Sequence, residues 1–106
     1  MSNRFIFDAN GDPKAETAPG ERLLGRFLEA DIQGSIRRCT AVLAALDDIA
    51  AGRRKRWQQT GNAHTLILSK RRARIQAESG SEPDLILSPA RLRQALLDWR
   101  ALLHKA

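Results

Sequence analysis

Residues 23–51, LLGRFLEADIQGSIRRCTAVLAALDDIAA, carry the longest apolar repeat of helical period in this chain of 106 residues. Apolar side chains return at spacings of three or four, at Leu28, Ile32, Ile36, Cys39, Leu43, Leu46 and Ala50. Such spacings place side chains on one face of an α-helix. Val42 and Ile49 widen that face, as in a helix that lies on a sheet. We therefore expect one helix over 23–51, with Gly34 inside it and Gly52 as its left-handed cap.

Short apolar and β-branched runs on both sides of this helix predict strands. We expect strands at residues 4–8, 14–18, 65–68, 73–77 and 84–87. Asn10-Gly11 favours a tight turn between the first two strands, because both residue types adopt positive φ angles. Residues 69–72 form the expected turn of a second hairpin, and residues 57–62 are expected to be a loop.

A second helix is expected to begin at Ser88-Pro89, since serine is a good N-cap and proline fits the first helical position. Its buried face comprises Leu92, Leu96, Trp99 and Leu103. The element order is then β-β-α-β-β-β-α. We predict a single α+β domain over residues 1–106, with both amphipathic helices packed on one face of a small antiparallel sheet.

The composition excludes several classes of protein. Apolar residues make up 42% of the chain and charged residues 28%, which suits a domain with an ordinary core. The single cysteine cannot form an internal disulfide, so a disulfide-stapled secreted scaffold is excluded. No apolar run reaches the roughly 18 residues of a membrane span, and the first residues do not resemble a signal peptide. We expect a cytoplasmic protein.

Residues that carry catalytic or metal chemistry are few and scattered. His64 and His104 stand forty residues apart, and Cys39 falls on the apolar face of the long helix, where it is expected to be a core residue. Asp47 and Asp48 are adjacent, so on a helix their carboxylates point apart. We therefore expect no catalytic site, no metal and no cofactor, and predict that the protein is not an enzyme. A deep pocket lined by His64 or Cys39 would favour the enzyme alternative.

Charge is the one unevenly distributed property. The net charge is +6, with a balance of −2 over residues 1–52 and +8 over residues 53–106. Two clusters hold most of this excess, with no acidic residue between them: cluster A is Arg53, Arg54, Lys55 and Arg56, and cluster B is Lys70, Arg71, Arg72 and Arg74. One sign of charge concentrated in this way attracts phosphates or acidic protein surfaces. A solvated surface that only maintains solubility explains the same residues equally well.

The hairpin at 65–77 would bring both clusters near the same edge of the sheet. We predict a non-enzymatic interaction protein whose basic surface, residues 53–74, binds an acidic partner, with nucleic acid or a transcription or translation complex favoured. The expected contact set is cluster A, cluster B and Trp57, although a core role for Trp57 is favoured over stacking on a base. The alternative is a purely protein–protein regulator that makes no nucleic-acid contact. No membrane partner and no small-molecule substrate are expected, and the choice between monomer and homodimer stays open.

The chain also resembles the YacL-like family of small uncharacterised bacterial proteins. The resemblance rests on residues 4–8 with Gly11, on Gly20 and Gly25-Arg26-Phe27, and on Trp57-Gln58 with Gly61 and Thr65-Leu66. It spans nearly the whole chain, including the C-terminal amphipathic helix around Leu96, Trp99 and Leu103. The chain departs from the family in two ways. The family has His-Glu after a glycine twice, whereas this chain has Glu21-Arg22 and Asn62-Ala63, and the acidic stretch expected before the last helix is shortened to residues 78–84. No role of those family histidines is therefore carried over. The resemblance implies a cytoplasmic bacterial protein and no particular reaction.

Overall fold

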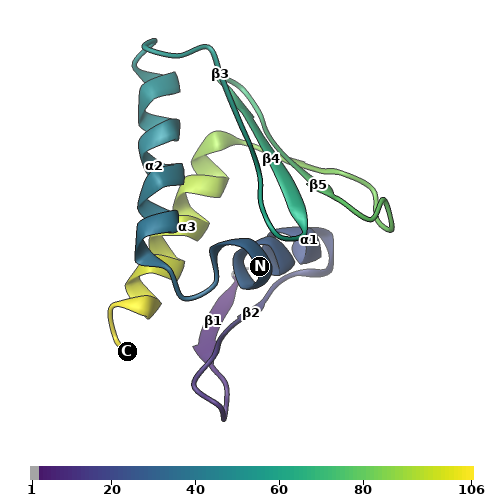
Figure 1. Cartoon of the computed structure of the whole chain (residues 1–106), viewed down its shortest axis with the longest axis vertical. Coiled ribbons are helices and arrows are strands. Elements are labelled where there is room, and N and C mark those ends of the chain that lie inside the picture. The colour runs from purple at the N-terminus through teal and green to yellow at the C-terminus, as the bar shows by residue number, and fades with distance from the viewer. Residues whose placement is uncertain (1–2) are drawn as a thin grey trace.

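The computed structural model describes residues 3–106 as two antiparallel sheets joined by helices (Figure 1). The strands are β1 (Arg4–Phe7), β2 (Pro13–Glu16), β3 (Arg56–Thr60), β4 (His64–Ser69), β5 (Ala73–Ala77) and β6 (Leu85–Leu87). The helices are η1 (Pro19–Glu21), α1 (Arg22–Phe27), η2 (Leu28–Ile32), α2 (Ile36–Ala50) and α3 (Pro89–Leu103). The predicted α+β class is confirmed. No helix in the described part of the chain is long and apolar enough to cross a membrane.

The N-terminal hairpin forms a sheet of its own, so the strands divide into two sheets where one was expected. The Asp8 carboxylate shapes its turn by accepting hydrogen bonds from the backbone N–H groups of Asn10 and Asp12, both at 2.9 Å. Phe5 of β1 packs edge-on against Trp99 of α3, with ring centroids 5.3 Å apart. This aromatic contact anchors the small sheet to the C-terminal helix.

The prediction of one continuous helix over 23–51 is wrong, because the chain turns at residues 33–35. Helix α1 continues into the π-helical segment η2, after which Gln33 adopts a left-handed φ of 56°. The hydroxyl of Ser35 then caps α2 by accepting a hydrogen bond from the Arg38 N–H at 3.1 Å. Ile32 and Ile36 flank this turn with the same spacing of four that a continuous helix would show, so the apolar pattern alone does not reveal it.

The larger sheet has the strand order β3-β4-β5-β6, with every pair antiparallel. Strand β3 occupies part of the segment that was expected to be a loop over 57–62, and that expectation is wrong. Trp57 is its only large apolar residue, since the strand lies at the edge of the sheet and is mostly exposed. An edge strand needs little apolar surface of its own, which is why its sequence resembles a loop.

One face of the larger sheet, here called the inner face, carries the core. Leu66 and Leu68 of β4 and Ala73 and Ile75 of β5 are at most 1% exposed. Helices α2 and α3 pack together and contribute the fully buried Cys39, Leu92, Leu96 and Trp99. Alternate residues of the same strands point to the opposite, outer face.

Candidate functional site

Strand register brings clusters A and B to one end of the larger sheet. Arg56, the first residue of β3, pairs with Ser69, the last residue of β4. Lys70 and Arg71 form the turn that follows, closed by a hydrogen bond of 2.9 Å from the Ser69 N–H to the Arg72 carbonyl. Both clusters lie at the top of Figure 1, where α2 leads into β3. The prediction that they lie near the same edge of the sheet is confirmed.

The end of α2 fixes where cluster A begins. Gly52 has a left-handed φ of 78°, as predicted for the cap. Its N–H donates to the carbonyl of Ile49 at 3.1 Å, and the Arg53 N–H donates to that of Asp48 at 2.9 Å. These two bonds form a Schellman motif, which reverses the chain within one turn. Cluster A therefore starts directly beside the sheet.

Most of the clustered cations make no ion pair with the part of the chain that the structure describes. Arg53 Nε lies 3.0 Å from Asp48 Oδ1, and Arg74 Nη1 lies 3.8 Å from Asp84 Oδ2. Within residues 3–106 the other six make no ion pair, and all six are exposed: Arg54, Lys55, Arg56, Lys70, Arg71 and Arg72. Uncompensated charge at one end of a sheet produces a local positive potential.

Three of the arginines share the outer face with a hollow of about 230 Å³. Its lining consists of Arg56 from β3, Ile67 and Ser69 from β4, Arg72 from the turn, and Arg74 from β5. The hollow depends on β3, the strand that the sequence analysis missed. Consequently the sequence indicated the basic clusters but not the face on which these arginines meet.

Trp57 lies on the opposite side of β3 from Arg56. It pairs with the fully buried Leu68 and packs against the core as a half-buried side chain. Because side chains directly opposite each other share a face, Trp57 points inward. The favoured core role of Trp57 is confirmed, and the outer face holds the arginines without it.

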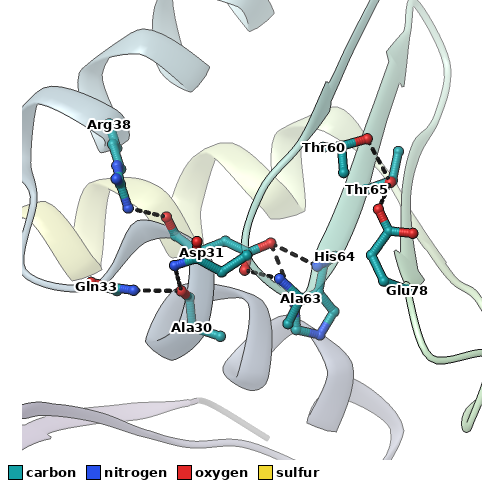
Figure 2. A network of polar contacts seen from close by, with 10 residues as sticks. Ala30, Asp31, Gln33, Arg38, Thr60, Ala63, His64, Thr65 and Glu78 are labelled. Carbon is teal, nitrogen blue, oxygen red and sulfur yellow. Dashed lines mark hydrogen bonds and ion pairs between the residues drawn. The ribbon is translucent and has the colours of Figure 1, made fainter.

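A buried carboxylate is the polar feature that sequence reasoning missed (Figure 2). Asp31 Oδ1 accepts from the Ala63 N–H at 2.9 Å, and Asp31 Oδ2 accepts from the His64 N–H at 3.0 Å. The His64 Nδ1 atom lies 3.4 Å from Asp31 Oδ2 and makes no hydrogen bond within the described residues. The carboxylate thus joins η2 to the turn between β3 and β4. In the sequence, Asp31 stands beside the apolar residues of the predicted helix, and that pattern does not indicate its role as a link.

Two hollows flank this pair of side chains. One of about 500 Å³ is bordered by Asp31, and one of about 350 Å³ is bordered by His64. Acid–base chemistry uses such residue types, but both carboxylate oxygens of Asp31 already accept backbone hydrogen bonds. The contact between Asp31 and His64 is therefore a structural link between η2 and the turn that leads into β4.

The remaining candidates for chemistry lie apart from one another. Cys39 is fully buried, its Sγ donates to the Leu96 carbonyl at 3.1 Å, and burial raises the pKa of its thiol to about 11. The predicted core role of Cys39 is confirmed. His104 is exposed at the end of α3. Asp47 pairs with Arg93 and Asp48 with Arg53, so these two carboxylates do point apart. In the part of the chain that the structure describes, no group of three or more His, Cys, Asp or Glu side chains is placed to hold a metal ion.

The structure is that of an α+β protein in which basic side chains gather at one end of the larger sheet. Sequence comparison shows the family to which the chain belongs. The model of the family described as "Uncharacterised protein family (UPF0231)" matches residues 1–86. The chain therefore belongs to UPF0231, which is the YacL family, and the resemblance noted from the sequence is confirmed over these residues. The C-terminal helix around Leu96, Trp99 and Leu103, which the resemblance was expected to include, lies beyond the matched residues.

A relative from Cronobacter sakazakii (strain ATCC BAA-894), a UPF0231 protein, is 29% identical over 77 residues. The matched segment covers 73% of this chain and 63% of the length of that relative. No solved structure matches the chain. Both basic clusters fall inside the region that the family model matches.

Proposed function

We propose that this chain is a non-enzymatic cytoplasmic protein that binds the phosphate backbone of nucleic acid, free or within a transcription or translation complex. The observation that supports the proposal is the meeting of clusters A and B at one end of the larger sheet, with six exposed side chains free of ion pairs in the described residues. Exposed cations that contact phosphates stay partly hydrated, and so do the phosphates, so little free energy is lost in removing water from either group.

The expected binding is electrostatic and independent of base sequence. Specific reading of bases requires side chains in a groove or aromatic platforms for stacking. The chain has no tyrosine and only five aromatic residues, and Trp57 and Trp99 pack against or within the core. Arginine and lysine contacts to phosphates release counterions, so affinity falls steeply as salt rises.

Fluorescence anisotropy with a labelled oligonucleotide of about 20 residues, single-stranded and duplex, tests the proposal over a range of salt concentrations. The test variant replaces Arg54, Lys55, Lys70 and Arg71 by glutamine. The matched control replaces four exposed cations elsewhere, at Lys14, Arg22, Arg37 and Lys105, which make no ion pair within residues 3–106. Both variants lower the net charge by the same amount.

We expect the test variant to lose most of its affinity and to show a smaller salt slope, by about 0.9 for each duplex phosphate contact removed. The control should keep the slope of the unmodified protein. Equal losses in the two variants would mean that net charge alone drives binding and would refute a site at the sheet end. Absence of oligonucleotide binding by the unmodified protein would refute the proposed function and favour a purely protein–protein regulator.

A further inference from the structure

The outer face of the larger sheet carries a distinct anion-binding arrangement. We propose that the hollow lined by Arg56, Ser69, Arg72 and Arg74 seats one phosphate group of a nucleic-acid backbone and so fixes where the backbone crosses the sheet. This inference rests on the proposed function and goes further, because it separates one defined phosphate site from the general positive charge around it.

Register places the donors around one point. Ser69 lies opposite Arg56 on one side and bonds to Arg72 across the turn on the other. Neighbouring strands lie about 4.8 Å apart, so the two arginines flank the serine from both sides. Arg74 stands two residues beyond Arg72 and therefore points to the same face, where it pairs with Ile67. Three guanidinium groups thus border one hollow.

The chemistry of the lining suits a phosphate. Each guanidinium offers five N–H donors in a planar fork that matches two phosphate oxygens, and no carboxylate lines the hollow. The Ser69 hydroxyl makes only a long contact of 3.4 Å to the Arg72 carbonyl, so it can turn to donate to an anion. The hollow has a volume of about 230 Å³, which accommodates a phosphate group with part of its hydration.

Charge changes along the outer face and limits the site to one end. The row that follows Arg74 toward the other end of the sheet contains Thr60, Thr65 and Gln76, which carry no charge. Beside this row, Asp84 accepts a hydrogen bond of 3.1 Å from the Gln76 side chain and lies 3.8 Å from Arg74; beyond the row, Glu78 accepts from the Thr65 hydroxyl at 2.9 Å. A backbone that enters at the basic end therefore meets neutral and then acidic groups if it continues along the strands. The favoured path crosses the strands at the hollow.

The turn residues Lys70 and Arg71 are also basic, but they do not line the hollow. Their side chains are exposed at the tip of the hairpin and add positive charge beside the hollow. The two groups of cations are therefore expected to respond differently to a change that keeps charge but alters shape. Lysine keeps the charge of arginine and lacks its planar fork.

Charge-conserving substitutions test the site. The test variant is R72K/R74K, and the matched control is R54K/R71K, which alters two arginines of the clusters that do not line the hollow. Far-UV circular dichroism and the thermal midpoint confirm that each variant is folded. Affinity for a labelled (dT)20 is measured at about 150 mM salt, together with ¹⁵N spectra of the arginine Nε–H groups and the Ser69 amide.

We expect R72K/R74K to weaken binding about tenfold, as for the loss of one charge-assisted hydrogen bond, and R54K/R71K to change it less than about twofold. The Ser69 amide and the Nε–H signals of Arg56, Arg72 and Arg74 should shift when the oligonucleotide is added. Equal effects of the two variants, with no shift at Ser69, would refute the phosphate site while leaving the proposed function intact. No binding of the oligonucleotide by the unmodified protein would refute both.

Discussion

Removal of the Asp31 carboxylate is expected to destabilise the fold strongly. The side chain is 5% exposed and accepts two backbone hydrogen bonds, from the N–H groups of Ala63 and His64. Asp31→Ala leaves the buried His64 donor and the partly buried Ala63 donor without this partner, at about 1–3 kcal/mol each, and removes packing against Gly61. The free energy of unfolding should fall by about 3–5 kcal/mol. That is a large part of the total stability of about 5–15 kcal/mol that domains have.

Asp31→Asn keeps the shape of the side chain and one of its two acceptor oxygens, so the free energy of unfolding should fall by about 2 kcal/mol. The stability of this variant can be measured even if the alanine variant does not fold. The surface control is Asp48→Ala, which breaks the exposed pair with Arg53 and should cost less than about 1 kcal/mol. Urea unfolding followed by circular dichroism gives the three values. With an m-value of about 1.5 kcal/mol/M, a loss of 3–5 kcal/mol lowers the midpoint by about 2–3 M.

Amide hydrogen exchange shows which part of the fold is loosened when Asp31 is replaced. The amides of Ala63 and His64 should exchange faster in Asp31→Asn than in the unmodified protein, and should be unchanged in Asp48→Ala. A cost below about 1 kcal/mol for Asp31→Ala, with exchange at these two amides unaltered, would show that the carboxylate does not link η2 to the β3–β4 turn.

Three further outcomes can be measured on the same protein. Gly61→Ala should cost about 1–3 kcal/mol, because its Cβ would lie 2.9 Å from the carboxylate carbon of Asp31; a urea midpoint equal to that of the unmodified protein would contradict this close approach. The hydrogen bonds from Arg91 lower the pKa of Glu21, so this pair stabilises the fold above the unfolded pKa of about 4.3 and the contribution disappears as the pH falls through the lower folded value. Glu21→Gln should therefore reduce stability at pH 7 by about 1 kcal/mol and leave it nearly unchanged at pH 2, as urea titrations at the two pH values would report. The Cys39 thiol, buried and with its pKa raised to about 11, should react with iodoacetamide at pH 8 only in urea; rapid labelling of the native protein would contradict its burial.

The sequence predicted the helices correctly where the apolar repeat depends only on residues close together in the chain. The apolar faces of α2 and α3 are buried where the spacing of three and four placed them, because a helix repeats its geometry every turn; Ala50 is the exception, since it is exposed at the last turn of α2. The turn at Gln33 was not predicted, since it depends on a distant contact. The Gln33 carbonyl accepts a hydrogen bond of 2.9 Å from the indole of Trp99, which lies 66 residues further along the chain.

The basic end of the sheet was predicted only in part, for a similar reason. The turn of the 65–77 hairpin is visible in the sequence, and it correctly placed cluster B beside cluster A. The hollow between the arginines requires the edge strand β3, whose five residues, Arg56–Thr60, contain one large apolar side chain. The link between Asp31 and His64 joins residues 33 positions apart and leaves no local pattern at all.

Helix α3 lies beyond the matched region 1–86, yet it closes the core from the C-terminal side. Leu92, Leu96 and Trp99 are 0% exposed. A segment with this role is constrained by the volume and direction of its side chains and much less by their identity. Chains shortened near residue 86 would leave the face of α2 that packs against α3 uncovered, and should therefore lose cooperative folding altogether.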